Sequence, residues 1–234
     1  MLVLVTRPLG QAARTARLLE ARGHDVLIDP VLEVRLLPVP LLGADIVAVA
    51  VTSANAVPAL AAIDPGLPVF AVGEATAAAA RAVGSSREIR VAEGSGIALA
   101  QLIGRSATPG RGTILHLAGT DVRPGFEKEL VESGYGYRRA IVYETMPTAD
   151  MDPAAAAAIR DHRLDAVLLY SPRSAALWAA KVSRLGLGPH LHGTIAACLS
   201  NAVAAPLRGL VLREVRVARA ADQKSLLGCL DAPE

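Results

Sequence analysis

The segment Asp45–Asn55 reads DIVAVAVTSAN, and it decides the fold class of the chain. Its apolar core, IVAVAV, is short, rich in β-branched residues and bounded by polar ones. Such a run is typical of a strand buried on both faces of a sheet. Strands of this kind belong to parallel sheets covered by helices. Small polar residues follow at once, where a helix would begin.

Similar apolar runs recur along the chain and alternate with alanine-rich segments of helical pattern. This alternation predicts βαβ units and therefore an α/β fold with parallel sheets flanked by helices. The predicted helices include Gln11–Arg22, Ala75–Val83, Phe126–Ser133 and Ala175–Leu185, each followed by a glycine that suits a helix end: Gly23, Gly84, Gly134 and Gly186. The other predicted strands are Leu2–Val5, Val26–Ile28, Val69–Val72, Ile89–Val91, Ile114–Leu117, Ile141–Tyr143, Ala166–Tyr170, Thr194–Leu199 and Val215–Val217.

The chain also repeats itself. RExRVA occurs at Arg87–Ala92 and again at Arg213–Ala218, and the run after Asp45 is echoed after Asp165. A weaker likeness relates residues 3–28 to residues 114–141. The segments follow one another as A, B, A′, B′, which indicates two similar α/β domains. Chance likeness between alanine-rich helices is the alternative, but it does not account for the RExRVA pair.

Two extended stretches, Val31–Pro38 and Ala140–Pro147, follow the A-type segments and end in proline. If both connect the domains, the linker has two strands, A pairs with B′, and the first domain is discontinuous. The pattern alone does not exclude the simpler arrangement, A with B and A′ with B′.

The composition of the chain limits the classes of function that it can have. The 234 residues are 52% hydrophobic with a net charge of +2, which excludes a disordered chain. No run of like charge favours nucleic acid or a membrane surface, and no apolar stretch is long enough to span a bilayer, so we expect a cytoplasmic protein. Cys198 and Cys229 lack metal-ligand spacing, so we expect no metal. Nearly all basic residues are arginine, which suits an anionic ligand or reflects codon bias.

Small polar residues and glycines follow most of the predicted strands. In open parallel sheets, ligands bind beyond the carboxyl ends of the strands, and helix N-termini there attract anions. Helix capping explains any one such residue equally well, but their number predicts a cleft between two domains that binds a polyanion. The candidates are Arg7, Thr52, Ser53, Asn55, Gly73, Thr76, Gly119, Ser171, Ser200 and Asn201.

The usual catalytic motifs are missing: there is no phosphate loop, no GxGxxG after a strand and no GxSxG. His116 lies within a strand, and we interpret it as structural. Tyr143, on the second extended stretch, is the remaining candidate. A phenol can donate a proton to a leaving hydroxyl, although packing of an aromatic ring on a linker is the alternative.

Taken together, these motifs resemble the uroporphyrinogen-III synthase family. The resemblance covers nearly the whole chain and rests on the order and spacing of VTRP at 5–8, TSANAV at 52–57, VGEATA at 72–77, VYET at 142–145 and YSPRSA at 170–175.

The resemblance implies two α/β domains joined by a two-stranded linker. The first would be discontinuous, residues 1–35 and 145–234, and the second would be residues 36–144, with linker strands near 31–38 and 140–147. It also implies a cofactor-free hydro-lyase of haem biosynthesis. The substrate would be hydroxymethylbilane, a linear tetrapyrrole with eight carboxylates, which closes into a ring with loss of water and inversion of ring D.

In this reaction the hydroxyl leaves ring A to give an azafulvene, ring D attacks through its substituted carbon, and the spiro intermediate fragments and recloses. The bilane also closes without an enzyme to the uninverted isomer. Since 1.4 kcal/mol between two barriers gives about a factor of ten, several contacts are needed for near-complete selection.

By the same resemblance, Tyr143 matches the tyrosine that assists departure of the hydroxyl, Ser53, Thr76 and Ser171 match cleft residues, and Arg7 and Arg123 are cleft arginines. The chain departs from the family where Val203 replaces a threonine, so that contact is lost or moves to Ser200 or Asn201. Asn55 stands where some relatives carry arginine. We expect a monomer, with hand-over of substrate from the preceding pathway enzyme as a further expectation.

Two other functions fit the residues. A non-catalytic, two-domain regulatory binder of an anionic small ligand would bind tightly without turnover. A nucleotide-binding protein fits less well, because the chain has no phosphate loop.

Overall fold

In the computed structural model, contacts divide the chain into two compact units. Unit 1 comprises Met1–Glu33 and Met146–Glu234, and unit 2 comprises Val34–Thr145. The structure describes residues 1–40, 43, 45–83, 87–106, 112–122 and 124–231. Gly84, expected to end a helix, lies outside this part of the chain.

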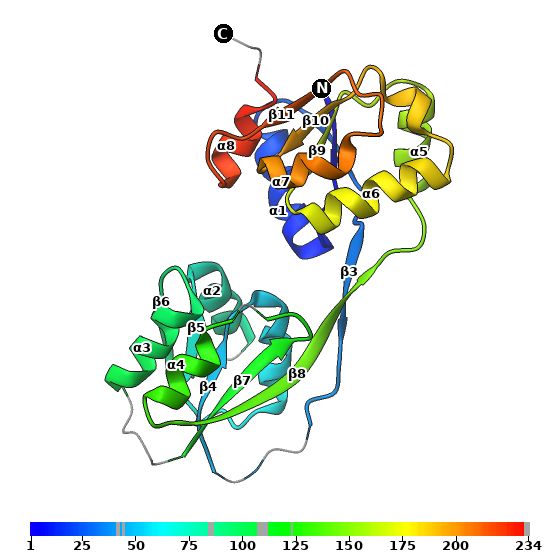
Figure 1. Ribbon diagram of the computed structural model, residues 1–234. Coiled ribbons are helices and arrows are strands. Elements are labelled where there is room, and N and C mark those ends of the chain that lie inside the picture. The colour runs from blue at the N-terminus through cyan, green and yellow to red at the C-terminus, as the bar shows by residue number, and fades with distance from the viewer. Residues whose placement is uncertain (41–42, 44, 84–86, 107–111, 123, 232–234) are drawn as a thin grey trace. The chain divides into compact units, whose positions relative to one another are not determined.

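Unit 1 is a five-stranded parallel sheet with the strand order β11-β10-β9-β1-β2. Helices cover both faces (Figure 1), as the apolar strands predict: α5, α6 and α7 pack on one and α1 and α8 on the other. The strands are β1 (Leu2–Val5), β2 (Asp25–Ile28), β9 (Ala166–Leu169), β10 (Ile195–Cys198) and β11 (Glu214–Val217). The helices are α1 (Leu9–Glu20), α5 (Pro153–Arg160), α6 (Pro172–Arg184), η2 (Gly188–Leu191), α7 (Asn201–Ala204), η3 (Ala205–Leu207) and α8 (Gln223–Gly228).

Unit 2 is a six-stranded sheet with the order β3-β8-β7-β4-β5-β6. One face packs against η1 and α2 and the other against α3 and α4. The strands are β3 (Leu32–Leu36), β4 (Ile46–Val51), β5 (Val69–Val72), β6 (Ile89–Ala92), β7 (Thr113–Gly119) and β8 (Gly136–Pro147). The helices are η1 (Ala54–Ala62), α2 (Glu74–Val83), α3 (Gly96–Ser106) and α4 (Phe126–Glu132).

The expected α/β fold with parallel sheets is confirmed, with β3 as an exception. The backbone N–H of Leu37 donates to Val142 O (2.8 Å), and that of Thr148 donates to Val31 O (3.1 Å). Residue numbers rise on one strand as they fall on the other, so β3 runs antiparallel to β8. The two extended stretches therefore form a hydrogen-bonded ribbon, and β8 is longer than the predicted Ile141–Tyr143.

The RExRVA repeat has the same place in both units. It forms β6, one of the two edge strands of unit 2, and β11, one of the two edge strands of unit 1. In each copy the second arginine donates to the glutamate two residues before it: Arg90 to Glu88 (2.7 Å) and Arg216 to Glu214 (2.8 Å). The same arginines also reach a backbone carbonyl at the end of the following helix, in α3 or after α8. The repeat is thus structural.

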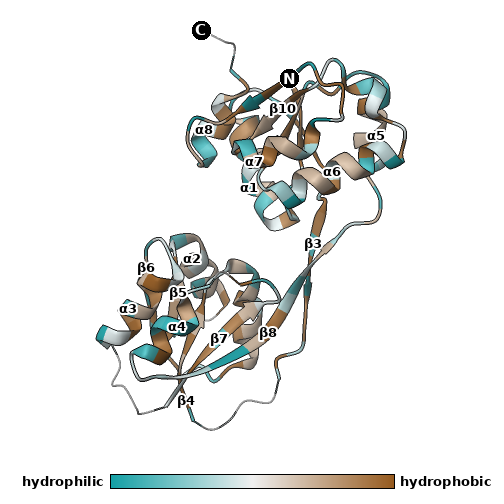
Figure 2. Ribbon diagram, viewed as in Figure 1, coloured by the Kyte–Doolittle hydropathy of each residue, from teal (hydrophilic) through white to brown (hydrophobic). Residues whose placement is uncertain are grey.

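Local signals place the helices. Asp152 accepts hydrogen bonds from Ala154 N and Ala155 N at the start of α5, a standard N-cap. Gly134 and Gly186 follow α4 and α6 with φ of +80° and +67°, a conformation that other residues rarely adopt. Figure 2 shows hydrophobic residues concentrated in the strands, whereas the helices mix hydrophobic and hydrophilic residues. The alanine-rich helices therefore bury one face each against a sheet.

A buried lysine on α6 is linked by hydrogen bonds to both segments of unit 1 at which the chain leaves and re-enters this unit. Lys181, only 5% exposed, donates through Nζ to Thr148 Oγ1 (2.6 Å) and Asp150 O (2.7 Å), just after β8. Thr148 Oγ1 in turn donates to Pro30 O (2.6 Å), just before β3. Burial lowers the pKa of Lys181 and raises that of nearby Asp29.

No helix in the part of the chain that the structure describes is long and apolar enough to cross a membrane.

Candidate functional site

The sheet of unit 2 has a topological switch point between β4 and β7. From β4 the chain moves outward through β5 and β6, whereas from β7 it moves to β8 on the other side. Ligands of such sheets bind beyond the carboxyl ends of the strands at this point. Thr52 and Ser53 follow β4 there, and Gly119 ends β7.

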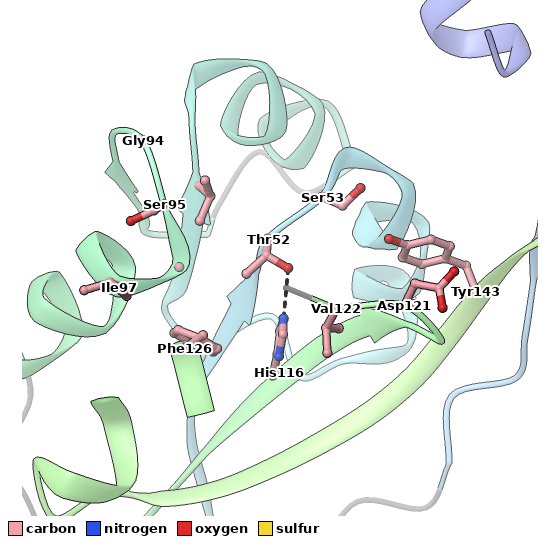
Figure 3. A pocket seen from close by; sticks show the side chains of 13 residues that line it. Thr52, Ser53, Gly94, Ser95, Ile97, His116, Asp121, Val122, Phe126 and Tyr143 are labelled. Carbon is pink, nitrogen blue, oxygen red and sulfur yellow. Dashed lines mark hydrogen bonds between the residues drawn. The ribbon is translucent and has the colours of Figure 1, made fainter. Parts of the chain in front are cut away.

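A pocket of about 400 Å³ opens at this switch point (Figure 3). Its polar side chains are Thr52, Ser53, Ser95, His116, Asp121 and Tyr143. The rest of the wall is apolar side chains and glycine backbone: Val72, Ile97, Val122, Phe126, Gly94, Gly96 and Gly119. Four predicted site residues, Thr52, Ser53, Gly119 and Tyr143, are therefore brought together here.

A β-bulge aims Tyr143 at the pocket. Ala118 pairs with Ile141 and Gly119 with Tyr143, so Val142 is the extra residue of β8. The bulge breaks the alternation of side chains, and Val142 and Tyr143 pack into the same core. Tyr143 is 9% exposed, and Figure 3 marks no hydrogen bond between its hydroxyl and the other pocket residues.

Arg139 holds the turn that carries Gly119. Its guanidinium donates to Gly119 O (3.0 Å) and Thr120 O (2.7 Å). The carbonyls of Gly119 and Thr120 are therefore both hydrogen-bonded to Arg139. Asp121, two residues after Gly119, brings the one carboxylate among the polar side chains of the pocket.

His116, interpreted from the sequence as structural, lies in the pocket wall. Its Nε2 is 2.9 Å from Thr52 Oγ1, and its Nδ1 is 3.0 Å from the Tyr137 hydroxyl. Burial, with a smaller contribution from Arg139, lowers the pKa of His116 to about 4. The imidazole is therefore neutral at neutral pH and does not attract an anion by charge.

Other predicted residues of unit 2 do not line this pocket. Asn55 donates its backbone N–H to Ser53 Oγ (3.3 Å), so Ser53 caps η1. Gly73 has φ of +73° and leads into α2, where Thr76 is 6% exposed. Their contact with substrate stays a prediction. Arg123 lies outside the described residues.

Arg7 lies at the corresponding switch point of unit 1, between β1 and β9. Its guanidinium donates to Gln11 Oε1 (2.6 and 3.0 Å) and Gln223 Oε1 (3.1 Å) and stacks 4.2 Å above the Tyr170 ring. The Tyr170 hydroxyl donates to the same Gln223 oxygen (3.0 Å). The Arg7 guanidinium is thus held in place by neutral groups, and its contact with an anion stays a prediction.

The remaining predicted residues begin helices of unit 1. Ser171 caps α6 by accepting from Ser174 N (3.1 Å). Ser200 precedes α7 without a side-chain cap bond, and exposed Asn201 is the first residue of that helix. Val203 is 2% exposed within the core of unit 1, so the side chain at this position packs and does not bind. The prediction that the residues of both units face one cleft stays a prediction.

Sequence reasoning missed Ser95 and Asp121. Thr52 follows β4 directly, whereas Ser95 comes after β6 with Glu93 and Gly94 between them, so the strand-end rule finds Ser95 when it is extended to Gly94-Ser95-Gly96. Asp121 lies two residues after Gly119, the last residue of β7, so the same rule reaches it as well.

Among the described residues no group of histidine, cysteine and acidic side chains is placed to hold a metal. Burial raises the pKa of the Cys198 thiol to about 12, so it is no nucleophile.

The fold and the pocket define an α/β protein that presents hydroxyl groups and helix starts at the carboxyl ends of its strands. The family model described as uroporphyrinogen-III synthase HemD matches residues 13–228. The chain belongs to the uroporphyrinogen-III synthase family. It is a hydro-lyase of haem biosynthesis that cyclises hydroxymethylbilane with loss of water and inversion of ring D.

Solved structures were found that resemble the chain over nearly its whole length. Uroporphyrinogen-III synthetase from Helicobacter pylori 26695 is 16% identical, with a TM-score of 0.61, and the match covers 97% of each chain, so the two share a fold. A mutant uroporphyrinogen III synthase from the extremely thermophilic bacterium Thermus thermophilus is 18% identical, with a TM-score of 0.46, covering 98% of this chain and 96% of that one. No curated protein sequence matches the chain significantly.

Proposed function

We propose that ring closure takes place at the pocket of unit 2, with Tyr143 as its catalytic residue. The supporting observation is that the β-bulge of β8 brings a phenol into a pocket whose other polar groups are mainly hydroxyls at strand ends. A phenol can protonate a leaving hydroxyl. Hydroxyls and backbone N–H groups can bind the carboxylates of a tetrapyrrole without adding charge.

In the proposed step, the C–O bond of the ring A hydroxymethyl group breaks while the pyrrole electrons form the exocyclic C=C bond. The departing hydroxide takes the proton of the Tyr143 hydroxyl and leaves as water. The resulting azafulvenium returns its N–H proton to the phenolate, which restores Tyr143 and leaves a neutral azafulvene. Ring D then attacks this electrophile.

We assign the remaining predicted residues to the carboxylates of the substrate. In unit 2 these are Thr52, Ser53, Asn55, Gly73, Thr76, Gly119 and Arg123, and in unit 1 they are Arg7, Ser171, Ser200 and Asn201. The restrained but neutral surroundings of Arg7 support its part in this set.

The test is the isomer formed. Purified protein is incubated with hydroxymethylbilane, and the products are oxidised and separated by chromatography. We expect the type III isomer to dominate. Formation of type I alone, with protein in excess over substrate, would contradict the proposal, and tight binding without turnover would support a regulatory binder instead.

The proposal extends to the setting of the enzyme. We assign residues 1–35 with 145–234 and residues 36–144 as its two domains, and we expect a cytoplasmic monomer that receives hydroxymethylbilane from the preceding pathway enzyme. Sedimentation equilibrium with and without that enzyme tests both points: a dimer, or no association at any concentration, would contradict them respectively.

A further inference from the structure

In unit 2, Thr52 and His116 line the Tyr143 pocket and are hydrogen-bonded to each other, and His116 is also hydrogen-bonded to Tyr137, which does not line the pocket. His116, 2% exposed, lies between Thr52 (2.9 Å) and the Tyr137 hydroxyl (3.0 Å), as Figure 3 shows for the first pair. The Phe126 ring packs edge-on against the imidazole, with centroids 4.8 Å apart. The ring is therefore fixed by two hydrogen bonds and an aromatic contact, and it cannot turn without losing them.

Burial sets the protonation states of His116 and Tyr137, the two titratable members of this hydrogen-bonded group. The lowered pKa of His116 leaves the imidazole neutral, with a single N–H. Burial raises the pKa of Tyr137, and Glu127 adds to this, so the phenol keeps its hydrogen. Arg139 acts on both residues: it opposes protonation of His116, and it partly offsets the rise in the pKa of Tyr137.

Only two hydrogen-bond arrangements satisfy all three side chains. In one, Tyr137 donates to Nδ1, Nε2–H donates to Thr52 Oγ1, and the Thr52 hydrogen remains available to the pocket. In the other, the Thr52 hydroxyl donates its hydrogen to Nε2, and Nδ1–H donates to the Tyr137 hydroxyl oxygen. Thr52 can donate to a ligand only in the first.

We propose that His116 is a positioning residue that makes Thr52 a hydrogen-bond donor to a carboxylate of the tetrapyrrole. A carboxylate accepts hydrogen bonds but cannot donate them, so it needs the first arrangement. Because His116 is neutral, it orients Thr52 without adding a charge that would hold the product. This inference rests on the proposed function, which supplies the carboxylate.

Kinetics with matched variants test the role. His116→Gln keeps an N–H near the position of Nε2, whereas His116→Leu and Thr52→Val remove the hydrogen bond. We expect His116→Leu and Thr52→Val each to raise KM for hydroxymethylbilane about fivefold to tenfold, with kcat within about twofold, as for one lost hydrogen bond. His116→Gln should stay near the wild type.

A double variant separates positioning from packing. If His116 acts through Thr52, adding His116→Leu to Thr52→Val raises KM no further. A wild-type KM in folded His116→Leu, or effects that multiply in the double variant, would overturn the proposal.

Nitrogen NMR of labelled, ligand-free wild-type protein gives a readout besides activity. We expect the Nε2-protonated tautomer of His116, and the Nδ1-protonated form would overturn the inference. If the wild type shows this tautomer but makes no type III isomer, the proposed function fails while the orientation of Thr52 stands.

Discussion

The ring of Tyr143 lies directly over the Cα atom of Gly119. A Cβ atom at residue 119 would be 2.6 Å from Tyr143 Cζ and 2.9 Å from its hydroxyl oxygen, closer than atoms of this kind approach. Gly119 is needed here for close approach, because its lack of a side chain makes room for the catalytic phenol.

Gly119→Ala should therefore displace the Tyr143 ring. We expect kcat to fall at least about tenfold, because a small shift of a catalytic group is costly. Steady-state assays of type III formation measure the effect. Gly104→Ala is the matched control, since a Cβ there meets nothing within 4 Å, and it should keep full activity. Equal rates for both variants would exclude the proposed placement of Tyr143.

Tyr143→Phe removes only the hydroxyl. We expect kcat to fall about 100-fold, in the range for one general acid, with little change in the thermal midpoint. Tyr135→Phe makes the same change in the opposite core of unit 2 and should alter stability more than rate. Wild-type kinetics of Tyr143→Phe would remove Tyr143 from the mechanism.

His116 should make stability depend on pH. Its pKa is about 4 in the folded protein against an ordinary 6.5, so on acidification the unfolded chain takes up the proton first. Above pH 6.5 His116 leaves the free energy of unfolding unchanged. Between pH 6.5 and 4 it lowers the free energy of unfolding by at most about 3 kcal/mol. Denaturant titrations followed by circular dichroism should show a shallower loss for His116→Gln, and identical pH profiles would contradict the assignment.

Lys181→Met should destabilise unit 1. It removes the donor to Thr148 and Asp150 and leaves Asp29 buried without its nearby cation, at a cost of about 3 kcal/mol. The fluorescence of Trp178, on the same helix, reports the unfolding. Adding Asp29→Asn should recover part of the loss, whereas exposed Lys224→Met should change stability by less than about 0.5 kcal/mol. Additive effects of the Lys181 and Asp29 changes would show that the two do not interact.

Much of the fold could be predicted because it depends on local pattern. The run Ile46–Val51 is apolar throughout since both faces of β4 are covered, and Gly134 and Gly186 end helices where left-handed backbone is required. The antiparallel pairing of β3 with β8 could not be predicted, because Leu37 and Val142 are distant in sequence and meet only in the folded chain.

The residues of the candidate site that follow strand ends could be predicted from the sequence. Those whose place depends on the register between paired strands could not. Thr52, Ser53 and Gly119 follow from the strand-end rule. The environment of His116 does not, because the pairing of β7 with β8 brings Tyr137 to it. The bulge at Val142 is likewise a property of two paired strands.

The hydrogen bond from the Thr148 backbone N–H to the Val31 carbonyl bears on how the two units are arranged along the chain. It brings the two points where the chain leaves and re-enters unit 1 next to each other. Unit 2 is in this sense a folded domain inserted into the sequence of unit 1. A tight turn between Val31 and Thr148 would close unit 1 into an uninterrupted chain, as a hairpin loop closes two strands.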